Sequence, residues 1–551
     1  MRRAAALLVV LAVLGLGAEM LRLSATRLYP RYDEVAYLAL ARGFAREGGA
    51  VGTIRCYLAG RCREDNRPPL YQFLLLPAAD DSPRFFADAK LVNMAIVLLL
   101  LGVVFVAVRR SFSGAVAVGS VIALALMPVL SDFGARVLHD VLFAAITFAA
   151  VFAIGRGQRA GFAWWLGCGA LVGLAFLTKG SGHLLWVPLL VASIYHHRTA
   201  LLRRPIVYAA ACGFVAVAFF LLWRNHLLWG SVFYNTNARQ VWIDQWRDLW
   251  ALQLTPEWNK VSLGWYLGRH SVWRLLYELG RSAVVLVGYF AYTAGVGPSV
   301  PVVRGVTGGV ILLLAAFGVR RRWRVGGHGA EVVAVLTTIG LYFAGLCLAA
   351  RGGPGAQLRY VFPYVLLLFP YAIYEALERF WPPLRDRLAA MRGLRLAPAA
   401  AACAVLGVVL FGRLAIAAFG ATANPRAAYA VEPRWHETSA WFARTLAPGE
   451  RFVLGYRSYY STWDAPRPDP DPRWNFWLGM PAGELLGFMD RSQIRQVLID
   501  TASAGYPELA DKLSQGADAH GPLAFLGWPR CFADSASPSR FLVYCRPAGR
   551  P

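Results

Sequence analysis

The stretch "LVNMAIVLLLLGVVFVAVRR", residues 91–110, decides the class of fold. Leu91–Val108 is an apolar run of the length that crosses a lipid bilayer as a helix, which takes about 17–25 residues. Arg109 and Arg110 follow directly, and basic residues beside a membrane helix favour the cytoplasmic side. The stretch therefore predicts a transmembrane helix that ends in the cytoplasm.

The composition of the whole chain agrees with a protein built of such helices. Of its 551 residues, 57% are hydrophobic and only 16% are charged, whereas soluble domains are about 45–50% apolar and about 25% charged. The net charge of +24 could indicate binding to nucleic acid. Arginine-rich cytoplasmic loops explain the charge more simply in so apolar a chain, and we expect no nucleic-acid partner.

Apolar stretches of similar length recur along the chain and bring the predicted total to about eleven spans. Two of them, Ala163–Leu177 and Leu184–Ile194, are shorter than a span usually needs. The pattern predicts an all-α polytopic membrane protein. The remaining stretches are Ala4–Leu23, Gly114–Leu130, Val137–Ile154, Ile206–Trp223, Val303–Val319, Val332–Ala349, Tyr360–Ala376 and Ala397–Phe419.

Basic clusters precede the first predicted span and follow the spans of even number. Such clusters face the cytoplasm, so we expect the N-terminus there, and the loops 24–90 and 226–300 and the C-terminal tail outside. This orientation requires that Arg281–Tyr292 does not cross the bilayer. We expect a multi-pass protein of the inner or plasma membrane, in contact with its lipids. The clusters are Arg2 with Arg3, Arg109 with Arg110, Arg156 with Arg159, His197 to Arg204, Arg320 to Arg324, and Arg385 to Arg395.

The C-terminal tail is polar enough to fold in water. We expect a transmembrane domain at residues 1–419 and a small extracytoplasmic α/β domain at residues 420–551. The proline-rich stretch Trp463–Arg473 must be a loop. The expected helices are Glu437–Leu446 and Pro507–Leu513, and the expected strands are Phe452–Tyr456, Ile494–Asp500 and Arg540–Cys545.

Cysteines occur as one pair in the first external loop, Cys56 and Cys62, and one pair in the tail, Cys531 and Cys545. An oxidising compartment favours disulfides, so we expect the bonds Cys56–Cys62 and Cys531–Cys545. A metal site at either pair is less favoured, because no histidine lies at ligand spacing beside it. The other cysteines fall in apolar spans and are expected to pack there.

Two adjacent carboxylates, Asp33 and Glu34, follow the first predicted span in "YPRYDEVAYLALARGFAREGG", residues 29–49. Either could cap the helix that begins there, because backbone N–H groups and the helix dipole favour anions at that end. Carboxylates at the membrane surface are costly, however, and usually functional. Asp33 and Glu34 are therefore candidate catalytic residues.

A third external acid, Asp140, lies at the outer end of the fourth predicted span in "GARVLHDVLF". Arg136 lies four residues earlier, which predicts a structural ion pair on one helix face. His139 could bind a metal, although a lone histidine more often packs or forms hydrogen bonds. Asp140 is a further candidate catalytic acid.

Three basic residues fall where the predicted topology is external. Arg67 precedes two prolines in "NRPPLYQFLLLP", residues 66–77, Lys179 lies in "FLTKGSGHLL", residues 176–185, and Arg359 lies in "GAQLRYVFPY", residues 355–364. Cations at the outer membrane surface suit a phosphate group. Together with the acids they suit transfer of a sugar from a lipid phosphate: a carboxylate takes the proton of the acceptor, and the cations stabilise the departing phosphate.

Several motifs together resemble those of the GT-C glycosyltransferases. The narrower likeness is to the dolichyl-phosphate-mannose protein mannosyltransferases and lipid A aminoarabinose transferases. The resemblance covers about residues 1–380 and implies a polytopic enzyme that takes a sugar from a polyprenyl phosphate on the outer face. The motifs are "YDEVAYLALAR" (32–42), "NRPPLYQFLLLP" (66–77), "LTKGSG" (177–182), "RNHLLWGSVFYNTN" (224–237) and "LRYVFPYVLLLFP" (358–370).

The resemblance implies roles for the residues already singled out. Asp33 matches the catalytic acid of the family, with Glu34 beside it, and the enzyme is expected to invert the anomeric centre. The further matches are Asp140 as a second external acid, and Arg67, Lys179 and Arg359 as contacts of the donor phosphate.

The chain departs from some relatives at one position. An acid or histidine that helps to hold a metal precedes their basic-Pro-Pro motif, whereas Asn66 stands there in this chain. A divalent metal is therefore left open as a cofactor, with His226 as one possible ligand.

Two alternatives remain open from the sequence. The chain could be a transporter or flippase of polyprenyl-linked sugars without transferase activity, which would need polar residues lining a path across the membrane. It could also transfer whole oligosaccharides. The sequence names neither the sugar nor the acceptor, which could be a protein, a lipid or a glycan.

Overall fold

The computed structural model describes most of the chain in two units. The first comprises Met1–Thr26, Tyr37–Ala238 and Trp273–Pro425, and the second comprises Arg27–Ala36, Arg239–Val272 and Arg426–Pro551. The residues that the structure describes are 2–27, 30, 33–62, 64, 67–80, 84–157, 160–198, 206–235, 237–244, 258, 260–297, 300–349, 357–390, 433–445, 452–455, 495–500, 528–533, 535 and 541–546.

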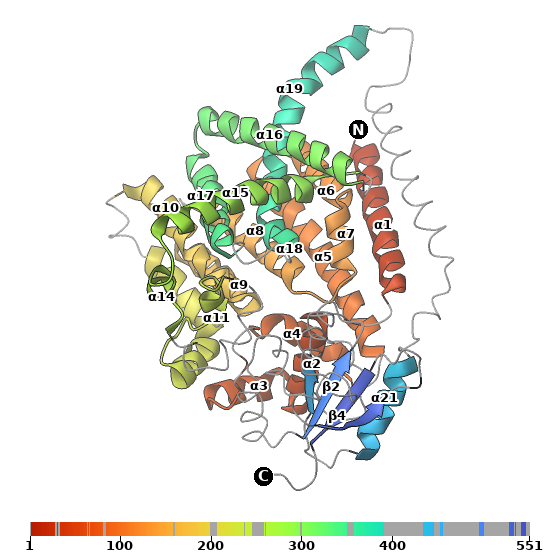
Figure 1. Ribbon diagram of the computed structural model, residues 1–551. Helices are drawn as coiled ribbons and strands as arrows, with labels where there is room; N and C mark the ends of the chain where they lie inside the picture. Colours follow the sequence, from red (N-terminus) through yellow and green to blue (C-terminus); the bar gives the residue numbers. More distant parts are fainter. Residues whose placement is uncertain are drawn as a thin grey trace. The chain divides into compact units, whose positions relative to one another are not determined.

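Long helices make up most of the first unit (Figure 1). Short helices in the first loop are α2 (Asp33–Arg46, whose first turn belongs to the second unit), α3 (Gly49–Leu58) and α4 (Leu70–Leu75). The long helices are α1 (Arg2–Thr26), α5 (Arg84–Ser111), α6 (Gly114–Ala125), α7 (Pro128–Gly134), α8 (Asp140–Arg156), α9 (Phe162–Thr178), α10 (Trp186–His197), α11 (Ile206–Trp229), α15 (Val272–Ala294), α16 (Pro301–Val325), α17 (Gly329–Ala349), α18 (Gln357–Leu366) and α19 (Phe369–Ala390).

Among the described helices, five are long and apolar enough to cross a membrane: Ala6–Thr26 within α1, and α5, α11, α16 and α17. Two bent pairs, α6 with α7 and α18 with α19, raise the number to seven if each pair is one span. The chain is therefore a multi-pass membrane protein. The remaining predicted spans form shorter helices (α8, α9 and α10) or, for Ala397–Phe419, lie outside the described residues, so the count of about eleven stays a prediction.

Helix α8 is the centre of the first unit. It packs against α5, α9, α17 and α18 (Figure 1), and nearly all of its side chains are buried. A helix that is apolar on all sides is typical of such a central position. The neighbouring pair α9 and α11 crosses closely at Gly169 and Gly213, where an added Cβ would collide with the backbone of the opposite helix.

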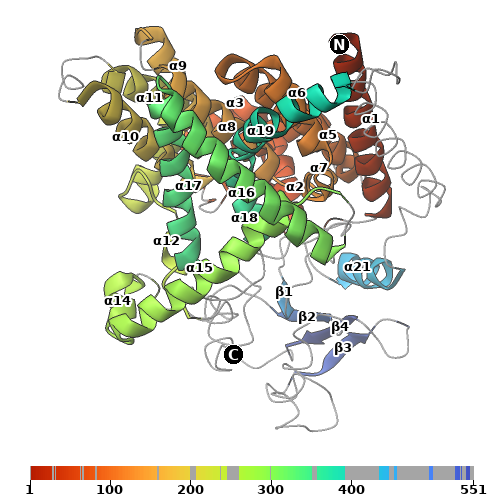
Figure 2. The same ribbon diagram turned by 90° about the horizontal axis from the view of Figure 1, so that it is seen from above.

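Basic residues gather at one end of this unit. Arg156, the last residue of α8, donates to the carbonyl oxygen of Arg110, and Arg322 of α16 donates to that of Ser111. Asp140 lies at the opposite end of α8. The clusters around Arg109 and Arg320 therefore lie at the same end, as the predicted topology requires. Helix α16 packs on α19 beside this end (Figure 2).

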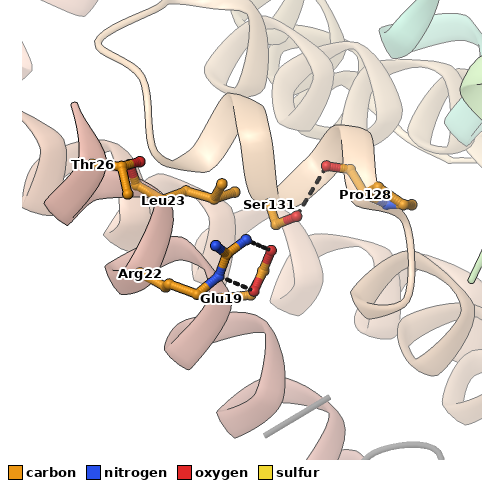
Figure 3. A network of polar contacts seen from close by, with 6 residues as sticks. All are labelled: Glu19, Arg22, Leu23, Thr26, Pro128 and Ser131. Atoms are coloured by element: carbon orange, nitrogen blue, oxygen red, sulfur yellow. Dashed lines mark hydrogen bonds and ion pairs between the residues drawn. The ribbon is translucent and has the colours of Figure 1, made fainter. Parts of the chain in front are cut away.

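Helix α1 packs on α6 and α7. Near its C-terminal end, the Arg22 guanidinium donates two hydrogen bonds to the Glu19 carboxylate, at 2.7 and 2.9 Å (Figure 3). Ser131 of α7 donates to the carbonyl oxygen of Pro128 at 2.9 Å. These polar groups are satisfied within their own helices, which leaves the apolar faces to form the contact.

The C-terminal part of the second unit is a small α/β arrangement, as predicted. The described strands are β1 (Phe452–Gly455), β2 (Gln496–Asp500), β3 (Arg530–Ala533) and β4 (Phe541–Cys545), in the order β1-β2-β4-β3. Strands β1 and β2 are parallel, and the other pairs are antiparallel. Helix α21 (Pro433–Thr445) packs on β3 and β4 (Figure 2). The predicted helix Pro507–Leu513 and loop Trp463–Arg473 lie outside the described residues.

The segment Arg239–Val272 contributes a small aromatic cluster of its own. Trp258 is buried with Ile243 and Val261, and Arg239 donates to the carbonyl oxygen of Trp258 at 3.2 Å. Trp242 and Trp265 pack against the same cluster.

Both predicted disulfides are present in the structure, Cys56–Cys62 in the first loop and Cys531–Cys545 between β3 and β4. Cys168 and Cys347 are free and buried in helices, whereas the free Cys212 is exposed.

Candidate functional site

Two cations from distant parts of the sequence meet on one buried carboxylate in the first unit. The Lys179 ammonium donates to Oδ1 of Asp140 at 3.1 Å, and Nε of Arg359 lies 3.9 Å from Oδ2. The side chain of Asp140 is fully buried, whereas those of Lys179 and Arg359 are 20% and 19% exposed. One negative charge thus holds two positive charges that solvent still reaches.

The helix ends explain this convergence. Asp140 is the first residue of α8, where the backbone N–H groups favour an anion, and Lys179 directly follows α9 with extended backbone angles. The turn after Lys179 is the short helix η3 (Gly180–Leu185), and Tyr342 of α17 donates to its Ser181 carbonyl oxygen at 2.7 Å. The N-terminal end of α8, the C-terminal end of α9 and the start of η3 therefore lie together.

Aromatic rings line the cation pair. The Lys179 ammonium lies 4.6 Å from the centre of the Tyr360 ring and 5.4 Å from that of Phe143. Arg359 donates to the hydroxyl of Tyr360 at 3.2 Å. Rings at these distances attract a cation through their faces, so they fix the position of Lys179 without adding negative charge.

Arg67 connects to the same region through Tyr37 of α2. Its guanidinium lies 5.8 Å from the centre of the Tyr37 ring, and the Tyr37 hydroxyl forms a hydrogen bond with Nδ1 of His139. His139 immediately precedes Asp140. His139 is therefore a hydrogen-bonded residue beside the candidate site.

The predicted ion pair between Arg136 and Asp140 is wrong. Arg136 binds Asp132 of α7 at 2.7 Å. The four-residue spacing fails because α7 ends at Gly134 and α8 begins only at Asp140, so the two residues do not share a helix. Asp140 instead contacts Lys179 and Arg359.

Asp33 and Glu34 form the first turn of α2, as their pattern predicts. The Glu34 residue is 3% exposed. Both residues belong to the second unit, and their action together with Asp140 stays a prediction. So does the role of each predicted site residue in catalysis or phosphate binding.

Among the residues that the structure describes, no group of three or more histidine, cysteine or acidic side chains is placed to hold a metal ion. His226 lies in the last turn of α11 beside the Trp223 ring. Asn66 lies outside the described residues.

Sequence reasoning missed four residues of this network: Tyr37, Glu64, Arg224 and Asn225. Tyr37 and Arg224 lie inside motifs that carry the resemblance, which was the available signal. No sequence motif pointed to Glu64, because its contact with Arg67 depends on the fold of the chain before the two prolines. The contacts of Glu64 and Arg224 are described below.

Comparison with known proteins agrees with this architecture. A family model described as dolichyl-phosphate-mannose-protein mannosyltransferase matches residues 85–223. The chain is similar to ArnT from Cupriavidus metallidurans bound to undecaprenyl phosphate, with 15% identity, a TM-score of 0.52 and coverage of 98% of both chains. No curated protein sequence matches it significantly.

A second similar structure is the archaeal oligosaccharyltransferase AglB from Archaeoglobus fulgidus, in complex with an inhibitory peptide and a dolichol-phosphate. Its identity is 13% and its TM-score 0.54, over 92% of this chain and 70% of that one. The helical architecture agrees with the family model over residues 85–223, and the two likenesses show that this chain shares the fold of ArnT and AglB.

Proposed function

We propose that this chain is a membrane glycosyltransferase that moves a sugar from a polyprenyl-phosphate donor to an acceptor on the outer face of the cytoplasmic membrane. The observation that carries the proposal is the meeting of Lys179 and Arg359 on the buried Asp140. Two cations that are held together on one carboxylate and still reach solvent suit a phosphate.

In this proposal Lys179 and Arg359 bind the phosphate of the donor. As the bond between the anomeric carbon and the phosphate oxygen breaks, its electron pair stays on the phosphate, and fixed cations stabilise the growing charge. Asp140 is fully buried, so it holds the two cations in place instead of taking a proton from an acceptor. In this proposal Asp140 is thus a residue that positions the two cations, whereas the sequence suggested it as a catalytic acid.

Asp33 is the proposed general base. It removes the proton of the acceptor hydroxyl as the acceptor oxygen attacks the anomeric carbon from the side opposite the phosphate, which inverts that centre. Glu34 assists beside it, and Arg67 contributes a further phosphate contact. The products are the glycosylated acceptor and the free polyprenyl phosphate.

Two kinds of observation support the donor and the location. The similar ArnT and AglB structures contain undecaprenyl phosphate and dolichol-phosphate, respectively, and both ligands are polyprenyl phosphates. The disulfides Cys56–Cys62 and Cys531–Cys545 suit an oxidising compartment. We therefore propose that the first loop and the C-terminal domain lie outside the cytoplasm, and that the basic end of the helices lies inside.

The test compares glycolipids and glycoproteins by mass spectrometry in cells with the gene, without it, and with the variant Asp33→Asn. We expect one sugar modification to disappear without the gene and to fall by about 10²–10⁴ in initial rate with Asp33→Asn. Glu47→Gln changes an exposed carboxylate of the same loop and should leave the modification unchanged.

Full activity of Asp33→Asn would remove the base assignment. An unchanged set of glycans without the gene would contradict the transferase. Movement of labelled carrier lipid between leaflets by the reconstituted chain, without sugar transfer, would favour the flippase instead.

A further inference from the structure

Arg224, in the last turns of α11, is a buried cation outside the site described above. It is 3% exposed. Its guanidinium donates to the backbone carbonyl oxygen of Glu64 through Nη1, and to Oδ1 of Asn225 through Nε at 3.2 Å and Nη2 at 2.7 Å. Arg224 therefore ties α11 to the segment that leads to Arg67.

Two aromatic rings hold this guanidinium in place. It lies 4.6 Å from the centre of the Tyr57 ring and 5.0 Å from that of Trp229. Burial raises the pKa of Tyr57 to about 12, so the phenol is neutral at pH 7 and meets the cation through its ring. Asn225 donates in turn to the carbonyl oxygens of Val232 and Tyr234, at 3.1 and 3.4 Å.

Further contacts bind the same segment to α3 and α11. The disulfide Cys56–Cys62 ends two residues before Glu64, and the indole of Trp223 donates to the carbonyl oxygen of Leu58 at 3.2 Å. Cys62 and Glu64 are therefore each held to a neighbouring helix before any ligand binds. Preorganisation of this kind lowers the entropic cost of binding.

Glu64 in turn contacts Arg67 through its carboxylate. Its Oε1 accepts the backbone N–H of Arg67 at 3.0 Å and lies 3.9 Å from Nη1 of the same residue. At 3.9 Å the ion pair is too long for a hydrogen bond, so Glu64 holds Arg67 through its backbone N–H and attracts its guanidinium through charge. Arg67 then reaches the face of Tyr37.

We propose that Glu64 and Arg224 are positioning residues that fix Arg67 for the phosphate of a polyprenyl-phosphate donor. Arg224 holds the backbone of Glu64, and the Glu64 carboxylate holds Arg67. The proposal rests on the proposed function, because it takes Arg67 as a contact of the donor phosphate. It assigns Glu64 no contact with the substrate.

Undecaprenyl phosphate is the probe for the first test, with binding to the full chain in lipid nanodiscs measured for a double-mutant cycle. We expect Arg67→Ala and Glu64→Ala each to weaken binding by about 10-fold, as loss of one charge-assisted contact does. Glu64→Gln retains an acceptor for the Arg67 N–H and should lose less. In the Arg67→Ala background, Glu64→Ala should change binding by less than about twofold.

A second test needs no ligand. Hydrogen exchange of the Arg67 amide should become about 10-fold faster in Arg224→Met, and less so in Arg224→Lys, which keeps a cation between the two rings. The matched control is Glu278→Gln, which breaks the exposed pair of Arg274 and Glu278 in α15 (3.1 Å). It should change neither the exchange nor the binding.

The outcomes separate this proposal from the function on which it rests. Additive losses in the double mutant, or an unchanged Arg67 amide in Arg224→Met, would overturn the positioning role while the wild type still binds the probe. A wild type that does not bind undecaprenyl phosphate would contradict the proposed donor, and faster exchange in Arg224→Met would then still show the contact through Glu64.

Discussion

Two buried carboxylates lie at opposite ends of α8, about 22 Å apart along the helix. Asp140 begins the helix, whereas Glu331 of α17 lies against Gly155 near its C-terminal end. Each pairs with a cation from another helix. A buried ion pair is present at both ends, so it cannot by itself distinguish a binding site from a structural contact.

The ion pair at the other end, between Arg322 and Glu331, is closed to solvent. Nε of Arg322 lies 3.8 Å from the carboxylate, and Tyr371 donates to it at 3.1 Å. The Arg322 and Glu331 side chains are only 8% and 5% exposed, and Arg322 also donates to the Ser111 carbonyl oxygen. The pair itself contains one charge of each sign and is almost fully buried, which is typical of a structural contact.

The end at Asp140 is partly open to solvent and brings two cations to one carboxylate. Lys179 and Arg359 share one carboxylate and are each about one-fifth exposed. A buried pair by itself is weak evidence for any function, because desolvation offsets much of the attraction. The presence of two cations on one carboxylate, and their exposure to solvent, are the features that suit a phosphate.

The largest expected effect is that of Lys179→Met. Removing one fixed cation should lower the transfer rate by about 10²–10³, because the charge on the departing phosphate loses a donor. The rate is measured per folded molecule, since Asp140 keeps only the longer contact with Arg359 and stability also falls. A rate within twofold of the wild type would contradict the phosphate role.

Arg322→Met makes the corresponding change at the closed end. Leaving Glu331 buried without its nearest cation should cost about 3 kcal/mol of the free energy of unfolding. Thermal unfolding of the full chain in nanodiscs measures the loss. The transfer rate per folded molecule should stay within about twofold, and a loss as large as that of Lys179→Met would erase the distinction between the two ends.

Gly169→Ala tests how precisely α9 must pack to place Lys179 at its end. An added Cβ meets the carbonyl oxygen of Ala210 in α11, so we expect a loss of about 1–3 kcal/mol in the free energy of unfolding. Gly167 lies in the same helix with nothing within 4 Å of an added Cβ. Gly167→Ala is therefore the control and should not destabilise, and equal losses in both variants would show that the crossing is not tight.

The smallest effect concerns an exposed carboxylate in the C-terminal domain. The backbone N–H and hydroxyl of Ser535 donate to Glu437 and lower the pKa of that carboxyl. A lowered pKa in the folded state adds stability above the unfolded pKa, and this stability is lost as the pH falls through the folded pKa. Hydrogen exchange of β4, corrected for intrinsic rate, should depend less on pH between about 3 and 5 in Glu437→Gln.

Local patterns predicted much of the fold. Apolar runs gave the long helices, period-two runs gave β2 and β4, and the pairing of cysteines within each external region gave both disulfides. Basic clusters indicated which helix ends lie together, and the contacts of Arg156 and Arg322 agree with that expectation. These features depend on residues close together in the sequence or on composition.

The site could be predicted only as a set of residue types. Lys179 and Asp140 are 39 residues apart, and no local rule pairs them, because their meeting depends on how α8 and α9 pack. The four-residue spacing predicted a contact between Arg136 and Asp140, but α7 ends before Arg136 and α8 begins only at Asp140. Glu64 and Arg224 were missed for the same reason, since their contact joins segments 160 residues apart.

The most direct test of the account measures the affinity of undecaprenyl phosphate for the wild type, Lys179→Met and Arg322→Met in nanodiscs. The account predicts that the wild type binds, that Lys179→Met binds about 10-fold to 100-fold more weakly because a charged hydrogen bond is lost, and that Arg322→Met binds within about twofold of the wild type. Equal affinity of Lys179→Met and the wild type would contradict it.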